Sequence, residues 1–166
     1  MMNTEAVEQA EEQIWHTRNQ INYTTLGLTV GYTVQMLRNG EIDIPEYQRP
    51  IVWTDQKRMR LIETVLLGLP FSELFAVKID EDKWELIDGV RRLTTLEAFL
   101  NNEIQLQNLE RLSKCDGFRF SDLSPLERGK FESRGTRIVL LLENVRPETR
   151  LDLFMRINGL DQLSTL

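Results

Sequence analysis

The junction between a strand and a helix at residues 84–100 constrains the fold of this chain more than any other feature. Residues 84–87 predict a strand that ends at Asp88-Gly89, and a helix begins at once, with apolar Leu93, Leu96, Phe99 and Leu100 on one face. At about 100° per residue, the opposite face carries Asp88, Arg91, Arg92 and Thr95. The free amides of a helix's first turn favour anions. The sequence therefore predicts an anion site beside two guanidinium groups.

Helical and strand patterns alternate irregularly along the rest of the chain. Apolar residues at helical spacing predict helices at residues 3–21, 32–38, 54–68, 89–100, 124–135 and from residue 147 onward. Alternating or continuous apolar runs predict strands at residues 42–44, 74–79, 84–87, 104–107 and 138–142. Residues 22–31, rich in Thr and Gly, predict a connector. Without a sustained βαβ repeat, this mixture predicts an α+β fold, a small mixed sheet surrounded by helices.

Local signals mark the ends of several predicted helices. Thr54 and Ser124 are suited to cap the helices that follow them, and Asn39-Gly40 is typical of a helix end. Residues 1–22 are expected to form an N-terminal helical appendage, and residues 23–166 the folded domain, either by itself or as the N-terminal part of a longer protein. The apolar stripe of the first helix would dock on the domain or on a second copy, which would make a homodimer.

Composition excludes several classes of function. The 166-residue chain contains one cysteine and one histidine, so neither an intramolecular disulfide nor a zinc site of several Cys and His ligands can form within it. We assign no residue as a metal ligand, although magnesium held by carboxylates stays open. The net charge of −6 argues against a protein that coats DNA, while a local basic pocket remains compatible with it. No apolar run approaches membrane-spanning length, and we expect a cytoplasmic protein without membrane contact.

Two prolines enclose a second candidate site. Pro45 and Pro50 prevent regular strand pairing, and between them lie Tyr47, Gln48 and Arg49. An ordered loop of this kind can present these side chains to a ligand. The alternative is structural, with the tyrosine buried and the arginine bonded to backbone carbonyls. Trp53, just beyond this loop, is interpreted as a core residue rather than a platform for a base.

Three motifs occur in a characteristic order: Ile-Pro-Glu-Tyr-Gln-Arg with Trp53 four residues on, Asp-Gly-Val-Arg-Arg-Leu-Thr-Thr-Leu from Asp88, and Phe-Met-Arg-Ile-Asn ending at Asn158. In this order they resemble the N-terminal domain of GmrSD-type restriction systems, a family similar to the ParB and sulfiredoxin fold. The resemblance covers about residues 29–166. It implies a ParB-like domain of bacterial or phage defence, often the nucleotide-hydrolysing sensor half of a protein whose other half is a nuclease.

The resemblance also implies roles for individual residues. Asp88 and Arg92 would be catalytic, and a nucleoside triphosphate with Mg²⁺ would be held by Tyr47, Gln48, Arg49, Gly89, Arg91, Arg92, Thr95, Arg156 and Asn158. The family's Asp-Gly-Gln-Gln-Arg motif is changed here, because Val90 and Arg91 replace both glutamines. Valine cannot orient a water molecule, whereas paired arginines after a glycine resemble the phosphate-binding box of ParB proteins. Phosphate binding is therefore better supported than hydrolysis.

Competing structural interpretations stay open at this point. Arg91 and Arg92 can pair with nearby carboxylates on the surface, where such pairs contribute little, and Asp88 can cap the helix. Thr95 can bond its own helix backbone. Arg58, between Lys57 and Arg60, is expected on a solvated face. The leading hypothesis is a nucleotide- or phosphate-binding domain. The alternative is a non-catalytic module on the same scaffold that contacts DNA, a nuclease domain or subunit, or another protein.

Overall fold

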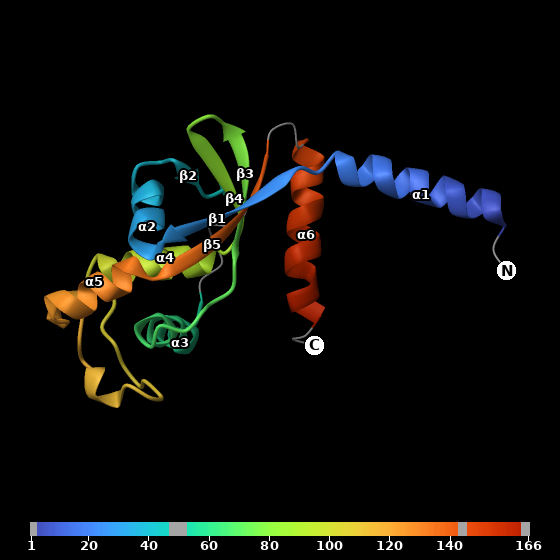
Figure 1. Ribbon diagram of the computed structural model, residues 1–166. Helices are drawn as coiled ribbons and strands as arrows, with labels where there is room; N and C mark the ends of the chain where they lie inside the picture. Colours follow the sequence, from blue (N-terminus) through green and yellow to red (C-terminus); the bar gives the residue numbers. More distant parts are fainter. Residues whose placement is uncertain (1–2, 47–52, 143–145, 164–166) are drawn as a thin grey trace.

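A mixed five-stranded sheet is the centre of the fold in the computed structural model, which describes residues 3–46, 53–142 and 146–163 (Figure 1). The strand order is β1-β5-β3-β4-β2. Strand β3 pairs antiparallel with β4 and parallel with β5, while β1 joins β5 antiparallel and β2 joins β4 in parallel. The strands are β1 (Tyr23–Thr29), β2 (Ile42–Asp43), β3 (Leu74–Asp80), β4 (Lys83–Asp88) and β5 (Gly135–Leu141).

Six α-helices accompany this sheet within the described residues, and the α+β prediction is confirmed. The helices are α1 (Thr4–Asn19), α2 (Val30–Arg38), α3 (Asp55–Leu66), α4 (Val90–Leu100), α5 (Pro125–Ser133) and α6 (Pro147–Leu163). The predicted caps form: the side chain of Thr54 accepts from the Lys57 amide, and that of Ser124 accepts from the Glu127 amide. These hydrogen bonds satisfy amide donors that the first helical turn leaves free. None of the described helices is long and apolar enough to cross a bilayer.

The main hydrophobic core lies between one face of the sheet and helices α2, α3, α4 and α5. Phe99, Phe120 and Phe131 meet edge to face in this core, with ring centroids 5.2 to 5.8 Å apart. The other face of the sheet buries a smaller group, Val77, Ile87 and Leu141, against which Leu153 of α6 packs. The unequal faces fix the orientation of α4, whose apolar side must point into the larger core.

Two sequence-based assignments are wrong. The predicted connector at residues 22–31 contains strand β1 and the start of α2. As an edge strand, β1 partly buries only Leu26 and Leu28, so its hydrophobic alternation is weak. The predicted strand at residues 104–107 is irregular: Ile104 and Leu106 are buried, yet the residue range forms no ladder. Its alternation reflects a loop that packs one side against the core.

Helix α1 extends away from the sheet in Figure 1, and none of its residues is buried. Its exposed apolar side chains include Val7, Ile14 and Trp15. In this structure the helix therefore does not dock on the domain's core, and its pairing with a second copy stays a prediction.

The junction between β4 and α4 depends on a glycine. Gly89 has a φ of 100°, a conformation that favours residues without a side chain. A Cβ placed there would lie 2.2 Å from Cδ2 of Leu74, which is too close for any real contact. Gly89 thus lets β3 and the start of α4 approach each other, and this brings the first turn of α4 to the edge of a pocket.

Candidate functional site

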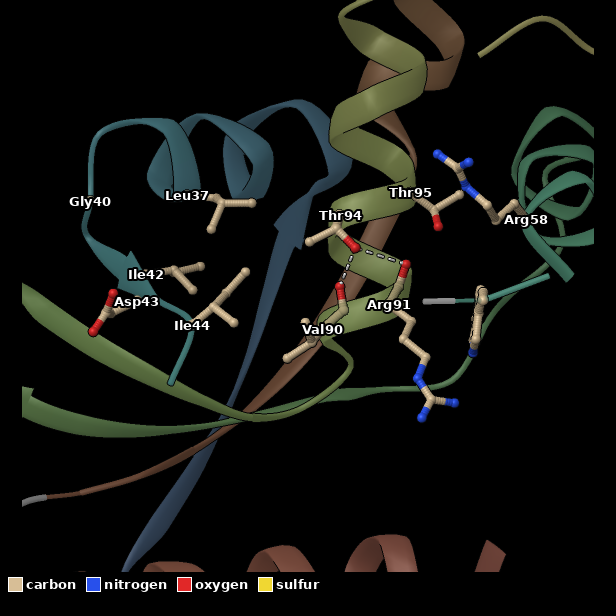
Figure 2. Close-up of a pocket in the computed structure, with 11 residues that line it drawn as sticks. Leu37, Gly40, Ile42, Asp43, Ile44, Arg58, Val90, Arg91, Thr94 and Thr95 are labelled. Carbon is tan, nitrogen blue, oxygen red and sulfur yellow. Dashed lines mark hydrogen bonds between the residues drawn. The ribbon is translucent and has the colours of Figure 1, made fainter. Parts of the chain in front are cut away.

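A pocket of about 500 Å³ lies between the β2 segment, α3 and the start of α4 (Figure 2). This volume is within the roughly 300–1,000 Å³ of ordinary small-ligand sites. The lining combines apolar side chains, two threonines, one aspartate and two arginines: Leu37, Gly40, Ile42, Asp43, Ile44, Trp53, Arg58, Val90, Arg91, Thr94 and Thr95. Residues from three separate stretches of the sequence therefore form one cavity.

The pocket has an apolar side and a basic side. Figure 2 shows Leu37, Ile42 and Ile44 on one side of Val90, and Arg91 and Arg58 on the other. Trp53 also lines the cavity and packs partly against the core. An apolar wall next to guanidinium groups suits a ligand that combines an apolar or aromatic portion with an anion.

Of the two arginines that line the pocket, Arg91 has fewer ties to the described part of the fold. Its side chain is half-buried, and its guanidinium forms no hydrogen bond or ion pair within the described part of the chain. Figure 2 shows it extending from the first turn of α4. A partly desolvated guanidinium without a partner is costly. An anion in the pocket would remove that cost.

Arg92, the next residue, has a different environment. Its guanidinium donates hydrogen bonds to Oδ2 of Asp88 at 3.0 Å and to the carbonyl oxygen of Glu73 at 2.9 Å. Only 14% of the Arg92 side chain and 23% of the Asp88 side chain are exposed. The two adjacent arginines thus diverge: Arg91 lines the pocket and Arg92 ties α4 to the sheet. That Arg92 holds a phosphate or acts in catalysis stays a prediction.

The expectation that Asp88 caps α4 is wrong. Gly89 occupies the N-cap position, and no side chain caps the helix there. The Asp88 carboxylate turns instead to Arg92, four residues later on the same side. A carboxylate cap and a carboxylate–guanidinium pair are both charge-assisted, and in this fold Asp88 forms the pair. Within the described residues, no side chain accepts a hydrogen bond at the N-cap of α4.

Arg58 was expected on a solvated face, and the structure corrects this. It lines the pocket, with 28% of its side chain exposed. Its position follows helical geometry, because Arg58 lies four residues before buried Ile62 and seven before buried Val65. That spacing in the sequence could have placed it inward, while Arg60 faces away from this pocket and borders a different one.

Thr94 and Thr95 differ in what they offer a ligand. The Thr94 hydroxyl donates to the carbonyl of Val90 at 2.8 Å, as the dashed lines in Figure 2 show, so its hydrogen is used within the helix. Thr95 lines the pocket and is 3% exposed. It contributes mainly to the floor of the cavity.

A buried charge with three backbone partners lies elsewhere, at Glu63 of α3, which is 5% exposed. Its carboxylate accepts from the backbone amides of Arg111 at 2.6 Å, Leu112 at 2.8 Å and Glu110 at 3.3 Å. Burial by itself raises the pKa of this carboxyl, but the three amide donors and the charge of Arg111 outweigh it, and the pKa is lowered. Glu63 anchors the loop after α4 and faces a separate cavity.

The remaining predicted site residues either lie outside the described part of the chain or do not line the pocket. Tyr47, Gln48 and Arg49 lie outside the described residues, as does the side chain of Asn158. Arg156 is exposed on α6 and pairs with Asp152, with Nε 2.7 Å from Oδ2. Among the residues that are described, no group of three or more His, Cys, Asp or Glu side chains could hold a metal ion. The structure therefore brings Arg91 and Thr95 together and adds Arg58.

The comparison with known families gives a match over most of the chain. The model of the family described as "GmrSD restriction endonuclease, N-terminal domain" matches residues 33–160. The matched region contains every part of the chain that lines the pocket. No curated protein matches the sequence.

Proposed function

The chain belongs to the family of N-terminal domains of GmrSD restriction endonucleases, and from this premise we propose that its pocket binds a nucleotide or a related phosphorylated ligand. The family places the chain in the context of restriction and defence. The ligand-binding role is an inference from the residues of the pocket.

One observation carries the proposal: the Arg91 guanidinium is half-buried in the pocket wall and has no partner among the described residues. It extends from the first turn of α4, where backbone amides also favour an anion. A phosphate is the anion that best fits a planar guanidinium, because two parallel N–H donors can meet two oxygens. The apolar residues opposite, Ile42, Ile44 and Val90, then provide room for a base or sugar.

Binding is better supported than turnover. Val90 is 9% exposed and packs in the core, so the position after Gly89 offers no side chain that could orient an attacking water. Asp88 is engaged by Arg92. Val90 therefore favours a domain that senses its ligand by binding and hydrolyses a triphosphate weakly. Complete loss of hydrolysis would favour the second candidate, a non-catalytic interaction module.

The test is a thermal-shift and calorimetric titration with each of the four ribonucleoside triphosphates and Mg²⁺. A ligand that binds the folded state raises the melting temperature by mass action. We expect Arg91→Ala to weaken binding by about ten- to a hundredfold, because hydrogen bonds to a charged group contribute about 1.5–3 kcal/mol.

Arg18→Ala is the matched control, since it removes the same charge from exposed α1. Its affinity should equal that of the wild type. The proposal fails when no triphosphate and no other phosphorylated nucleotide shifts the melting temperature, or when Arg91→Ala and Arg18→Ala bind the same nucleotide equally well.

A further inference from the structure

The two arginines of the pocket point to different ends of it. In Figure 2 the Arg58 guanidinium lies at the level of Thr95, while the Arg91 guanidinium extends beyond the first turn of α4 in the opposite direction. Both line the same cavity, with apolar Val90 and Ile44 in its wall. One phosphate or one compact polyphosphate chain at Arg91 therefore leaves the Arg58 end of the pocket without a counter-charge.

Arg58 has little to bond with in the fold itself. Its one ion-pair partner within the described residues is Asp55, at 3.8 Å between Nη1 and Oδ1. That distance is too long for a hydrogen bond. The Asp55 side chain is 70% exposed, so the attraction is weakened by solvent. A guanidinium carries five N–H donors and no acceptor. The donors of Arg58 are thus available to an acceptor group in the pocket.

Resting on the proposed function, we propose that Arg58 is a second anion-binding residue and that the pocket takes a nucleoside flanked by two separate phosphates. Arg91 holds one phosphate and Arg58 the other. The nucleoside lies between them against the apolar wall and Trp53, which lines the pocket. A nucleoside 3′,5′-bisphosphate has this arrangement of charges, and so does a single-stranded nucleic acid at a phosphorylated end.

The geometry favours this ligand over a nucleotide whose phosphates all lie at one end, and the reason is electrostatic. A nucleoside triphosphate carries its whole charge at one end, and it can satisfy one arginine fully while the base faces the other. Two cationic groups at the two ends of an apolar pocket repel each other less when each has its own anion. Each guanidinium can then form its bidentate contact with one phosphate.

The experiment compares the 5′-monophosphates and 3′,5′-bisphosphates of the four nucleosides by calorimetry. We expect the preferred bisphosphate to bind wild type about tenfold more tightly than the matching monophosphate. Arg58→Ala should abolish this advantage, because it should weaken binding of the bisphosphate much more than binding of the monophosphate. Arg58→Lys keeps the charge but loses the two parallel N–H donors of the guanidinium. It should retain part of the tighter binding of the bisphosphate.

Arg60→Ala is the control on the same helix, because Arg60 is exposed and borders a different cavity. It should keep the full advantage of the bisphosphate. A denaturation curve for each variant establishes that the protein is folded. The inference is overturned when monophosphate and bisphosphate bind wild type equally, or when Arg58→Ala weakens both alike.

A further arm identifies the source of the ligand. A 5′-phosphorylated tetranucleotide that binds at least as tightly as the bisphosphate, with the same loss in Arg58→Ala, would identify a strand end. Tight binding of the bisphosphate alone would identify a small molecule. Binding of monophosphates through Arg91 without a bisphosphate advantage would leave the proposed function standing and remove this inference, whereas no binding of any phosphate would remove both.

Discussion

Glu63 is a buried charge and Arg91 a half-buried one, and their surroundings are opposite. The Glu63 carboxylate accepts three backbone amide hydrogen bonds from one loop. The Arg91 guanidinium has no such partner among the described residues. The first charge is satisfied within the fold. Under the proposed function, the second is satisfied by a ligand in the pocket, so the contrast would separate a charge that serves stability from a charge that serves binding.

Arg92 lies between these extremes and sharpens the contrast, because it follows Arg91 directly. Its two hydrogen bonds, to Asp88 and to the Glu73 carbonyl, join the start of α4 to β4 and the chain before β3. Adjacent residues of one type thus have different roles, set by the direction in which each leaves the helix. Stability and ligand binding should respond separately to their substitution.

The largest effect on stability is expected from Glu63→Gln. An amide has one acceptor oxygen and cannot serve three donors, so part-buried N–H groups of the loop lose their acceptor. We expect a loss of about 3 kcal/mol in the free energy of unfolding, measured by urea denaturation. Glu110→Gln is the control, since that exposed side chain is replaced while its backbone amide is retained. Equal stability of the two variants would contradict the anchoring role of Glu63.

A smaller loss, about 1–2 kcal/mol, is expected from Arg92→Ala. The substitution removes two hydrogen bonds and leaves the Asp88 carboxylate, with 23% of its side chain exposed, without its cation. Chemical denaturation beside Arg91→Ala measures the difference. If the two variants lose the same stability, Arg92 contributes no more to the free energy of unfolding than Arg91 does. Its guanidinium would then be available to the ligand.

We expect acid to reduce the contribution of the Glu63 carboxylate to the free energy of unfolding. The pKa of Glu63 is lower in the folded state than in the unfolded chain, so the carboxylate's contribution is present above the unfolded pKa and is lost as the pH falls through the folded one. Wild type should therefore lose more stability than Glu63→Gln between about pH 5 and pH 3. Parallel pH profiles of the two proteins would show that this carboxylate is not preferentially charged in the fold.

The smallest effect on stability is expected from Arg91→Ala, within about 0.5 kcal/mol of wild type. Its guanidinium has no bond to lose within the described chain. Melting temperatures without ligand measure this, and the nucleotide titration measures the affinity that should fall. A large loss of stability without ligand would mean that Arg91 is held by the fold after all.

The helices were predictable because their signals are local. Thr54 and Ser124 act within four residues of themselves, and the apolar stripe of α4 is continuous in the sequence. The junction at Gly89 was predictable for the same reason. Strand β1 was missed because an edge strand needs only one buried side, and Leu26 and Leu28 are too few to show a pattern.

The composition of the site was less predictable, because it depends on contacts between distant segments. Glu63 bonds to amides 47 to 49 residues away, and no short motif marks such a carboxylate. Arg91 was identified from its place after Gly89. Its divergence from Arg92 required the positions of Asp88 and Glu73. The inward position of Arg58 could have been predicted from its helical spacing to Ile62 and Val65. Its charge led instead to the prediction of a solvated face.

The pairing of β1 with β5 has a consequence for how the chain reaches this structure. Residues 23–29 are synthesised well before the strand they pair with, which spans residues 135–141. Contacts between such distant segments form slowly, because the entropy of closing a long loop is lost before the contacts can stabilise the structure. During synthesis β1 therefore has no partner until almost all of the sheet has been made. We expect this edge to be the last part of the sheet to gain protection from hydrogen exchange during refolding.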